Sequence, residues 1–482
     1  MKLKRILKDI EVKEIKGSKD IEITGVCSDS RRVFPGNLFI ARKGLEYDAA
    51  DFIPDAVSAG AVAIVTDLYN PFLDKIVQVI HEDPASIEAD LAANYFEYPS
   101  KQLFMIGITG TNGKTTTSYL IKQLLDNLQK PSGLIGSIEY NTGLQKHAAS
   151  KTTPDSVTNQ KLLKEMLLND CKACVMEVTS HGLMQKRVKN IDFDVAIFTH
   201  LTQDHLDYHH SMDEYLQAKK ILFDSLSEEK WAVVNADSEH SGSLTKNIKA
   251  KIFSYGIEKP ADLQAMNIST SISGTTFDVV YQNQTYSITS PLVGIFNVYN
   301  VLAAIAAVIL AGFSITECIQ LIENLQLVPG RLEKVKVKKP FSVFVDFSHT
   351  PDALEKVLFT LHQMKRGKII TVFGCGGNRD AKKRPLMAKV SEKYSDLSII
   401  TNDNPRKEDP ESIAKEIVSG FQSYSNYQVV LDRKEAIEHA IKLAKEDDII
   451  VIAGKGHEKR QIFKLLAVDF DDVKCVEEAC KH

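Results

Sequence analysis

The chain has 482 residues, a formal net charge of −4, 25% charged residues and 44% hydrophobic residues. One hydrophobic core rarely supports this length, so we expect a globular protein of two or three domains. The charge balance gives no basic excess to favour nucleic acid binding, and seven scattered cysteines are too few for a disulfide scaffold and fit a reducing compartment.

Neither the amino terminus nor the most apolar segment predicts membrane insertion. The first residues, MKLKRILKDI, carry Leu3, Ile6, Leu7 and Ile10 at helical spacing and not as a continuous signal-peptide core. The most apolar run, VLAAIAAVILAGF from Val301, is shorter than the roughly 20 residues that cross a bilayer. We therefore expect a cytoplasmic protein without a membrane-inserted segment.

Residues 1–98 predict a smaller α/β domain. Short strand signals, among them NLFIA and AVAIVTD, precede the turn-like sequence EYPS. We place the first domain boundary at residue 98.

Residues 99–330 predict a doubly wound, mostly parallel sheet. The runs LFMIGIT, ACVMEV, DVAIFT and WAVVNA are typical of buried parallel strands, and amphipathic stretches such as TSYLIKQLLDNLQ separate them. The alternating sequence TFDVVYQNQTYSIT predicts an antiparallel hairpin added to this sheet. A second α/β series follows the hinge-like VPGRLE and predicts a Rossmann-like domain over residues 331–482.

The sequence GITGTNGKTTTSYL, residues 107–120, predicts a phosphate-binding loop. A strand, a glycine-rich turn and a helix start bring free backbone N–H groups and the positive end of a helix dipole together. Ile108 stands where the strict phosphate-loop pattern has its first glycine, so the match is the shorter run GTNGKT from Gly110. Lys114 is predicted to reach the terminal phosphates of a nucleoside triphosphate, and the Thr115 hydroxyl to bind Mg²⁺.

Acidic and histidine side chains follow the next two strands of this predicted sheet. They are Glu177, His181, Asp204, His205 and Asp207. Because the carboxyl ends of parallel strands share one edge of a sheet, this pattern predicts a magnesium site beside the phosphate loop. His209 and His210 are predicted to be surface residues.

Several motifs together resemble the Mur ligase family. In chain order they are SDSRRVFPGNLFIA, GTNGKTT, MEVTSHGL, DHLDYH, YLQAKK, GIFNVYN, PGRLE, HTPDALE, FGCGGNRD, DNPR and GKGHE, and they span nearly the whole chain. The resemblance is to the branch that adds the third residue of the peptidoglycan stem peptide. It implies a monomeric ligase, with ATP as co-substrate and Mg²⁺ as cofactor, that joins meso-diaminopimelate to UDP-N-acetylmuramoyl-L-alanyl-D-glutamate.

The resemblance implies a role for individual residues in three sites. For ATP they are Gly110, Thr111, Asn112, Gly113, Lys114, Thr115, Thr116, Asn297 and Asn300. For the UDP-muramoyl-peptide they are Ser28, Ser30, Thr152, Thr153, Thr179, Gln185 and Arg187. For the incoming amino acid they are Arg379, Asp403, Asn404, Pro405, Arg406, Gly454 and Glu458.

The implied catalytic and metal-binding residues are Lys114, Thr115, Glu177, His205 and Lys219. The helical pattern alone predicts an exposed lysine at Lys219, whereas the family carries this lysine as a carbamate formed from CO₂. The carbamate would replace a cation that repels Mg²⁺ with an anionic oxygen ligand.

The expected chemistry is activation of a carboxylate as an acyl phosphate, followed by attack of an amine. We expect Arg406 in DNPR to select diaminopimelate, because a guanidinium pairs bidentately with a carboxylate that lysine lacks. In the family, lysine-adding members carry another residue at this position.

Several positions depart from the usual family pattern, among them His210, Phe347, Ser348 and Asn378. Two alternative functions stay open at this point. The first is an L-lysine-adding or other Mur ligase, or a folylpolyglutamate synthase relative. The motifs TTPD and DNPR disfavour both of these options. The second is a catalytically inactive nucleotide-binding regulator, which the presence of the implied catalytic residues disfavours.

Overall fold

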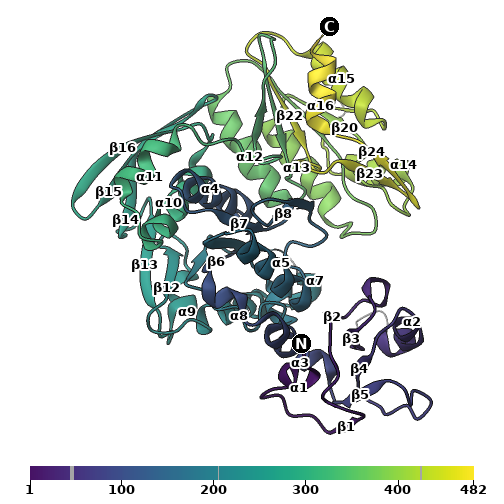
Figure 1. The fold of residues 1–482 in the computed structure, drawn as a ribbon. Coiled ribbons are helices and arrows are strands. Elements are labelled where there is room, and N and C mark those ends of the chain that lie inside the picture. The colour runs from purple at the N-terminus through teal and green to yellow at the C-terminus, as the bar shows by residue number, and fades with distance from the viewer. Residues whose placement is uncertain (44–47, 203, 205, 424–425, 482) are drawn as a thin grey trace.

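Three large β-sheets follow one another along the chain in this computed structural model, each with its own flanking helices (Figure 1). The structure describes residues 1–43, 48–202, 204, 206–423 and 426–481. The three sheets confirm the predicted α/β class with mostly parallel strands. The predicted boundaries at residues 98 and 330 fall between the sheets. That they separate domains stays a prediction.

The first sheet has five short strands in the order β1-β5-β4-β3-β2, and all its pairs are parallel except β1 with β5. Its strands are β1 (Glu14–Lys16), β2 (Gly25–Cys27), β3 (Asn37–Ile40), β4 (Ala63–Thr66) and β5 (Val77–Ile80). The helices of this part are α1 (Leu3–Ile6), α2 (Ile53–Ser58) and α3 (Pro84–Phe96). Helix α3 buries Ile87 and Leu91 in the same apolar core as Leu38 and Val65 of the strands.

The second sheet has eleven strands in the order β16-β15-β14-β13-β12-β11-β6-β10-β7-β8-β9. They are β6 (Phe104–Thr109), β7 (Ser132–Ile135), β8 (Glu139–Asn141), β9 (Lys146–Ala148), β10 (Ala173–Glu177), β11 (Val195–Phe198), β12 (Trp231–Asn235), β13 (Lys251–Gly256), β14 (Leu263–Ser271), β15 (Gly274–Tyr281) and β16 (Gln284–Ser290). The strands from β13 to β7 are parallel. Strands β15 and β16 form the antiparallel hairpin that the alternating sequence predicted, and β14, which was not predicted, joins this hairpin to β13.

The helices of this second part cover both faces of its parallel strands. They are α4 (Lys114–Asn127), α5 (Ser156–Leu168), α6 (Ser180–Met184), α7 (Leu206–His209), α8 (Met212–Asp224), α9 (Ser241–Thr245), α10 (Ile295–Leu310) and α11 (Ile315–Ile322). Helices α4 and α10 pack in one core, on Ile106 and Ile197, and α5 and α8 in the other, on Met105 and Phe198. The apolar run from Val301 is thus a buried core helix.

The third sheet has the order β17-β18-β22-β19-β20-β21, with β17 alone antiparallel to its neighbour, as expected for a Rossmann-like unit. Its strands are β17 (Glu333–Val335), β18 (Ser342–Asp346), β19 (Ile369–Phe373), β20 (Leu397–Ile400), β21 (Tyr427–Val429) and β22 (Ile449–Ala453), and the hairpin β23 (Arg460–Phe463) and β24 (Leu466–Asp469) follows. The helices are α12 (Pro351–Met364), α13 (Lys383–Tyr394), α14 (Pro410–Val418), α15 (Arg433–Leu443) and α16 (Asp472–Ala479).

Strand register decides which loops meet. Strand β6 lies between β10 and β11, with Ile108 opposite Glu177 on one side and Thr109 opposite Phe198 on the other. The loop after β6 therefore lies between the ends of two neighbouring parallel strands, where open α/β sheets bind ligands.

None of the helices in the described part of the chain combines the length and the apolar character that a bilayer crossing requires. All seven cysteines are unpaired thiols, and Cys480 alone among them is not buried.

Candidate active site

The loop between β6 and α4 requires glycine at two positions. Gly110 has a φ of +147° and Gly113 a φ of +87°, which side chains rarely adopt. A Cβ at position 110 would lie 1.8 Å from the Thr199 hydroxyl, and a Cβ at position 113 would lie 2.6 Å from Asn300 Oδ1. The loop is therefore held tightly against β11 and α10, and its helix begins at Lys114 with the positive dipole end directed at the loop.

Lys114 curls back over this loop. Its Nζ donates to the carbonyl oxygens of Gly110 and Thr111, each at 2.8 Å. Burial lowers the pKa of Lys114, and the carboxylates of Glu177 and Asp204 oppose this effect. A cation held at the centre of such a loop is suited to phosphate oxygens.

Glu177, at the carboxyl end of β10, is fully buried. It bridges the phosphate loop and Ser137, which follows β7. Its Oε2 accepts hydrogen bonds from Thr115 Oγ1 at 2.9 Å and from Ser137 Oγ at 3.0 Å. Its Oε1 accepts from the Ser137 N–H at 2.9 Å, and a Cβ on Gly136 would lie only 2.4 Å from this oxygen. Position 136 therefore favours glycine, because a side chain there would collide with the Glu177 carboxylate.

The oxygen donors of Thr115 and Glu177 fit a hard cation such as Mg²⁺. Within the described residues, no group of three or more His, Cys, Asp and Glu side chains has metal-site geometry. His205, the third predicted ligand, lies outside the described residues, so the predicted ligand set as a whole stays a prediction.

Lys219 lies in a different environment from the exposed one that the helical pattern predicts. The side chain is 1% exposed on α8, and its Nζ lies 4.3 Å from the centre of the Tyr215 ring. Burial lowers the pKa of Lys219 well below the ordinary value, and Lys114 adds to this effect while Asp204 opposes it. The exposed-lysine expectation is therefore wrong, because this face of α8 packs against the sheet and not against solvent.

His209 also differs from the prediction that it lies at the surface. It is 3% exposed, and its Nε2 lies 2.8 Å from Ser180 Oγ at the start of α6. The predicted surface position holds for His210, which is exposed and has a φ of +58°, a left-handed conformation that glycine adopts more readily.

Asn297 and Asn300 lie next to the phosphate loop on α10, and both are buried. Asn300 Oδ1 accepts a hydrogen bond from Thr117 Oγ1 at 3.3 Å, and its Nδ2 donates to Asn297 Oδ1 at 2.9 Å. Asn297 Nδ2 in turn donates to the carbonyl oxygen of Val293. The hydrogen bonds of these two amides therefore help to hold the phosphate loop and the start of α4 against α10. Thr116 is likewise buried in α4.

The predicted muramoyl-peptide residues of the second part form one hydrogen-bonded group beside Glu177. Thr153 Oγ1 donates to the Glu177 carbonyl oxygen at 2.9 Å and accepts from Thr179 Oγ1 at 3.0 Å. Arg187 Nη1 donates to the Thr153 carbonyl oxygen at 2.8 Å and also pairs with Gln185. Thr152 Oγ1 lies 3.0 Å from the Ser137 hydroxyl that contacts Glu177. This group therefore borders the phosphate loop.

Ser28 and Ser30 follow β2 in the first sheet. The Ser28 hydroxyl donates to Glu88 on α3 at 3.1 Å, and Ser30 begins a short 3₁₀ turn that Asp29 caps. Arg42, at the end of β3, pairs with the same Glu88. Arg42 also lowers the pKa of Arg187, after burial, so the two sheets contribute to one charged region.

The predicted amino-acid residues gather at the carboxyl edge of the third sheet. Asn404 Nδ2 donates to Glu458 at 2.8 Å, and a Cβ on Gly454 would lie 2.6 Å from Asp403. Burial lowers the pKa of Arg406, as does Arg379, while Asp403 opposes the shift. These residues and Pro405 therefore form a single cluster with two arginines.

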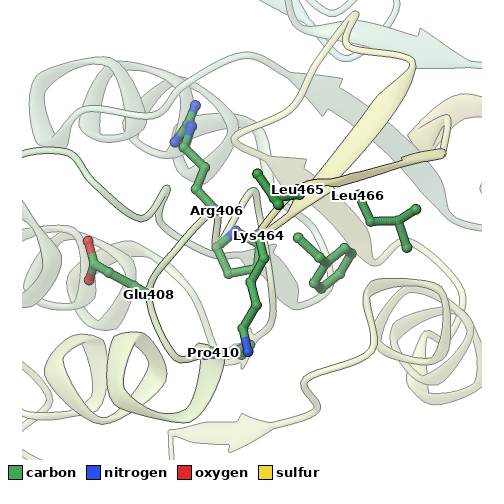
Figure 2. A pocket seen from close by; sticks show the side chains of 8 residues that line it. Arg406, Glu408, Pro410, Lys464, Leu465 and Leu466 are labelled. Carbon is green, nitrogen blue, oxygen red and sulfur yellow. The ribbon is translucent and has the colours of Figure 1, made fainter.

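Arg406 also borders an apolar hollow of about 510 Å³ between the DNPR loop and the hairpin of β23 and β24. Figure 2 shows the Arg406 side chain pointing away from the hairpin and the Lys464 side chain pointing in the opposite direction. The Arg406 guanidinium donates instead to the carbonyl oxygen of Gly377.

Two further side chains in the site were not predicted from the sequence. Arg331, in the hinge-like PGRLE, is half-buried, donates from Nη2 to Thr115 Oγ1 at 3.1 Å and stacks over the Phe347 ring at 4.8 Å. Asp352, at the start of α12, accepts from Asn112 at 3.2 Å and Thr202 at 3.3 Å. Both cross between the second and third parts of the chain, and pairing between distant segments leaves no local sequence signal.

Three family descriptions match successive parts of the chain. They are the Mur ligase family catalytic domain at residues 22–95, the Mur ligase middle domain at residues 108–308, and the Mur ligase glutamate ligase domain at residues 330–456.

Curated relatives are similar over the full chain. The UDP-N-acetylmuramoyl-L-alanyl-D-glutamate–2,6-diaminopimelate ligase of Chlamydia caviae is 46% identical over 481 residues, covering 99% of both chains. The ligase of the same name from Bacillus cereus is 43% identical over 464 residues, covering 95% of this chain and 94% of that one.

Solved structures agree in fold. A structure with the same ligase name has a TM-score of 0.71 at 31% identity, covering 100% of this chain and 99% of that one. The MurF ligase of Thermotoga maritima in complex with ADP has a TM-score of 0.65 at 19% identity, covering 89% and 93%, and shows likeness of fold alone.

Proposed function

The chain belongs to the Mur ligase family, and from that premise we propose that it is an ATP-dependent ligase that joins meso-diaminopimelate to UDP-N-acetylmuramoyl-L-alanyl-D-glutamate in peptidoglycan precursor synthesis. The observation that carries this proposal is the position of Glu177. This carboxylate contacts the phosphate-loop residue Thr115 and, through Ser137, the muramoyl-peptide residue Thr152. A nucleotide and an acid substrate bound by these residues would meet at one point.

The first chemical step joins the substrate carboxylate to the γ-phosphate of ATP. An oxygen of the D-glutamyl side-chain carboxylate attacks phosphorus, the bond from phosphorus to the bridging oxygen of ADP breaks, and an acyl phosphate forms. Lys114 stands among the loop carbonyls where negative charge develops, and it lowers the barrier by electrostatic stabilisation.

The second step forms the amide. The amine of the incoming amino acid attacks the acyl carbon, the carbon–oxygen bond to phosphate breaks, and the amine gives up its proton. Asp352 brings α12 of the third part into contact with Asn112 of the phosphate loop. We infer that this arrangement keeps water away from the acyl phosphate while the amine approaches.

Thr115 and Glu177 would hold Mg²⁺, together with His205 and a carbamate of Lys219. When bound, the ion supplies positive charge next to the phosphate oxygens. The buried, low-pKa amine of Lys219 supports the carbamate, because only a neutral amine adds CO₂, giving N–COO⁻ and releasing one proton.

Arg406 would pair with the distal carboxylate of meso-diaminopimelate. Its guanidinium lies in a cluster with Arg379, where an anionic ligand would relieve the repulsion between two cations. A lysine substrate would leave the pair unneutralised, which is the basis of the proposed selectivity. We also propose a monomer, as the family resemblance implies.

A product assay tests the proposal. Purified protein receives ATP, Mg²⁺ and the UDP-muramoyl-dipeptide with either meso-diaminopimelate or L-lysine, and product mass and phosphate release are followed. We expect product with diaminopimelate, and loss of both signals in Lys114→Ala but not in the control Lys122→Ala on the same helix. Preference for lysine, or wild-type phosphate release by Lys114→Ala, would contradict the proposal.

A further inference from the structure

An ion pair with a buried carboxylate lies behind Ser28 in the first part of the chain, and the side chain of its arginine, Arg42, is 36% exposed. Glu88 is 3% exposed on α3, accepts the Ser28 hydroxyl proton on Oε1 at 3.1 Å and pairs through Oε2 with Arg42 Nη1 at 3.1 Å. Ser28 and Arg42 follow β2 and β3, which are parallel neighbours, so their positions at one edge of the sheet are fixed by strand register.

Burying a carboxylate without a strong structural reason is unfavourable. Burial raises the pKa of Glu88, and Arg42 opposes this shift. An apolar residue would fill this position on α3 at lower cost, since the neighbouring residues Ile87 and Leu91 are core residues. The pair is therefore better explained by what it does to Ser28 than by stability.

Hydrogen-bond direction gives that explanation. An ionised carboxylate has no proton to donate, so the Ser28 hydroxyl must donate to it. The remaining lone pairs of Ser28 Oγ then face any ligand as acceptors only. A serine without this partner could present either its proton or its lone pair.

Positive charge is in excess around this triplet of Ser28, Glu88 and Arg42. Burial lowers the pKa of Lys151, with Arg187 and Arg42 adding to the effect. Against these three cations stand Glu88 and Asp155, which act in the opposite direction on Lys151. Such a region suits an anionic ligand, and Glu88 is the acid that keeps Arg42 in a fixed position.

We propose that Glu88 and Arg42 are positioning residues for the nucleotide of the substrate, Glu88 fixing the Ser28 oxygen as an acceptor for a ligand N–H or O–H and Arg42 keeping Glu88 ionised. This inference rests on the proposed function. The complementary donor is the ring N–H of uracil or a ribose hydroxyl.

Steady-state kinetics with the UDP-muramoyl-dipeptide tests the role. We expect Glu88→Leu to raise KM for this substrate about 10-fold with little change in kcat, because one oriented hydrogen bond is lost. Arg42→Leu should raise KM to a similar extent. The matched control is Asp90→Asn on the same helix, whose side chain pairs with Lys189 and Asn190 and does not contact Ser28. Its KM should stay at the wild-type value.

The double variant Arg42→Leu/Glu88→Leu separates positioning from folding. It replaces the ion pair with apolar side chains, so we expect wild-type thermal stability together with a raised KM. Recovery of wild-type KM in this variant would overturn the proposal and leave the pair a purely structural role.

Competition by UDP and CDP identifies the ligand donor. If the uracil N–H is the partner, Glu88→Leu loses most of the preference for UDP over CDP; if a ribose hydroxyl is the partner, both inhibitors weaken equally. Unchanged inhibition by both would refute the proposal. The proposed function would fail separately, through absence of product with the wild-type protein.

Discussion

Arg406 donates from Nη1 to the carbonyl oxygen of Gly377 at 2.8 Å. The arginine has a φ of +53°, a left-handed conformation that non-glycine residues adopt infrequently, and its backbone N–H is bonded to Ile462 of the hairpin. A Cβ on Gly376 would lie 2.8 Å from Nη1, so the glycine pair in this loop leaves the space that the guanidinium occupies. Backbone on two sides thus directs the side chain before any substrate binds.

Replacing Arg406 is expected to remove selectivity for diaminopimelate. Lysine at this position keeps the charge but cannot make two parallel hydrogen bonds to a carboxylate. We expect Arg406→Lys to lower kcat/KM for meso-diaminopimelate roughly 100-fold, while the low activity with L-lysine changes little. Competition between the two amino acids, followed by product mass, measures this ratio.

The control for this prediction is Lys464→Gln. Lys464 contacts the Arg406 carbonyl oxygen through its backbone, but its side chain points the other way (Figure 2). Equal loss of selectivity in this variant would show that the loop, and not the guanidinium, sets the preference.

Lys219 should reduce stability at neutral pH, because an amine is buried next to Lys114. Between its lowered folded pKa and the ordinary value of 10.5, the unfolded chain binds a proton that the folded chain releases. The free energy of unfolding therefore rises with pH over this interval, and the destabilising effect is greatest below the folded pKa.

Substitution of Lys219 by Met is then expected to raise thermal stability at pH 7 in CO₂-free buffer and to flatten the pH dependence, while ligase activity is lost. Thermal unfolding at several pH values measures this change. Lys220→Met is the control, since the Lys220 side chain is 16% exposed and its charge is balanced by a pair with Asp224. A drop in stability for Lys219→Met would contradict the interpretation of a destabilising buried amine.

Asp352 should act on nucleotide use although it belongs to the third part of the chain. One of its oxygens accepts from Asn112, Thr202 and Lys356. We expect Asp352→Ala to lower kcat/KM for ATP about 10-fold, because the contact between α12 and the phosphate loop is lost. Steady-state kinetics measures kcat/KM for ATP. The control is Glu355→Ala, also on α12, which breaks pairs with Lys393 and Tyr394 of α13 and should leave kcat/KM for ATP unchanged.

The fully buried pair of Arg433 and Asp472 should matter for folding of the third part. Arg433 Nε and Nη2 bind Asp472 at 2.7 and 2.8 Å, and Nη1 donates to the Asn402 carbonyl oxygen next to the DNPR loop. Leaving one buried charge without its partner costs about 3–5 kcal/mol. We expect Asp472→Asn to lower the free energy of unfolding by about this amount in urea denaturation.

The double variant Arg433→Leu/Asp472→Leu should recover most of that loss, since an apolar pair needs no charge compensation. A single variant as stable as the wild-type protein would show that solvent reaches Arg433.

Strands with a buried apolar run, such as β3 and β4 of the first sheet and β6, β10, β11 and β12 of the second, were predicted from the sequence because such a run is a local signal. Short strands such as β1, β8 and β9 have no such run and were not predicted. The phosphate loop was predictable from a local signal as well, since Gly110, Gly113 and Lys114 are close in sequence. Lys219 and His209 were assigned to the wrong environment by pattern alone, because burial depends on which face of a short helix meets the sheet. Glu88 and Arg331 had no local signal at all, since their partners lie far away in the chain.

Arg331 has one further consequence. It lies in the segment that leads from the second sheet into the third, and its guanidinium reaches back to Thr115 at the nucleotide loop. Any rotation of the third part relative to the second about this segment would move the Arg331 guanidinium toward or away from that loop. Occupancy of the loop and the angle between the second and third parts are thus coupled through Arg331, so a bound triphosphate would shift the preferred angle by attracting this guanidinium.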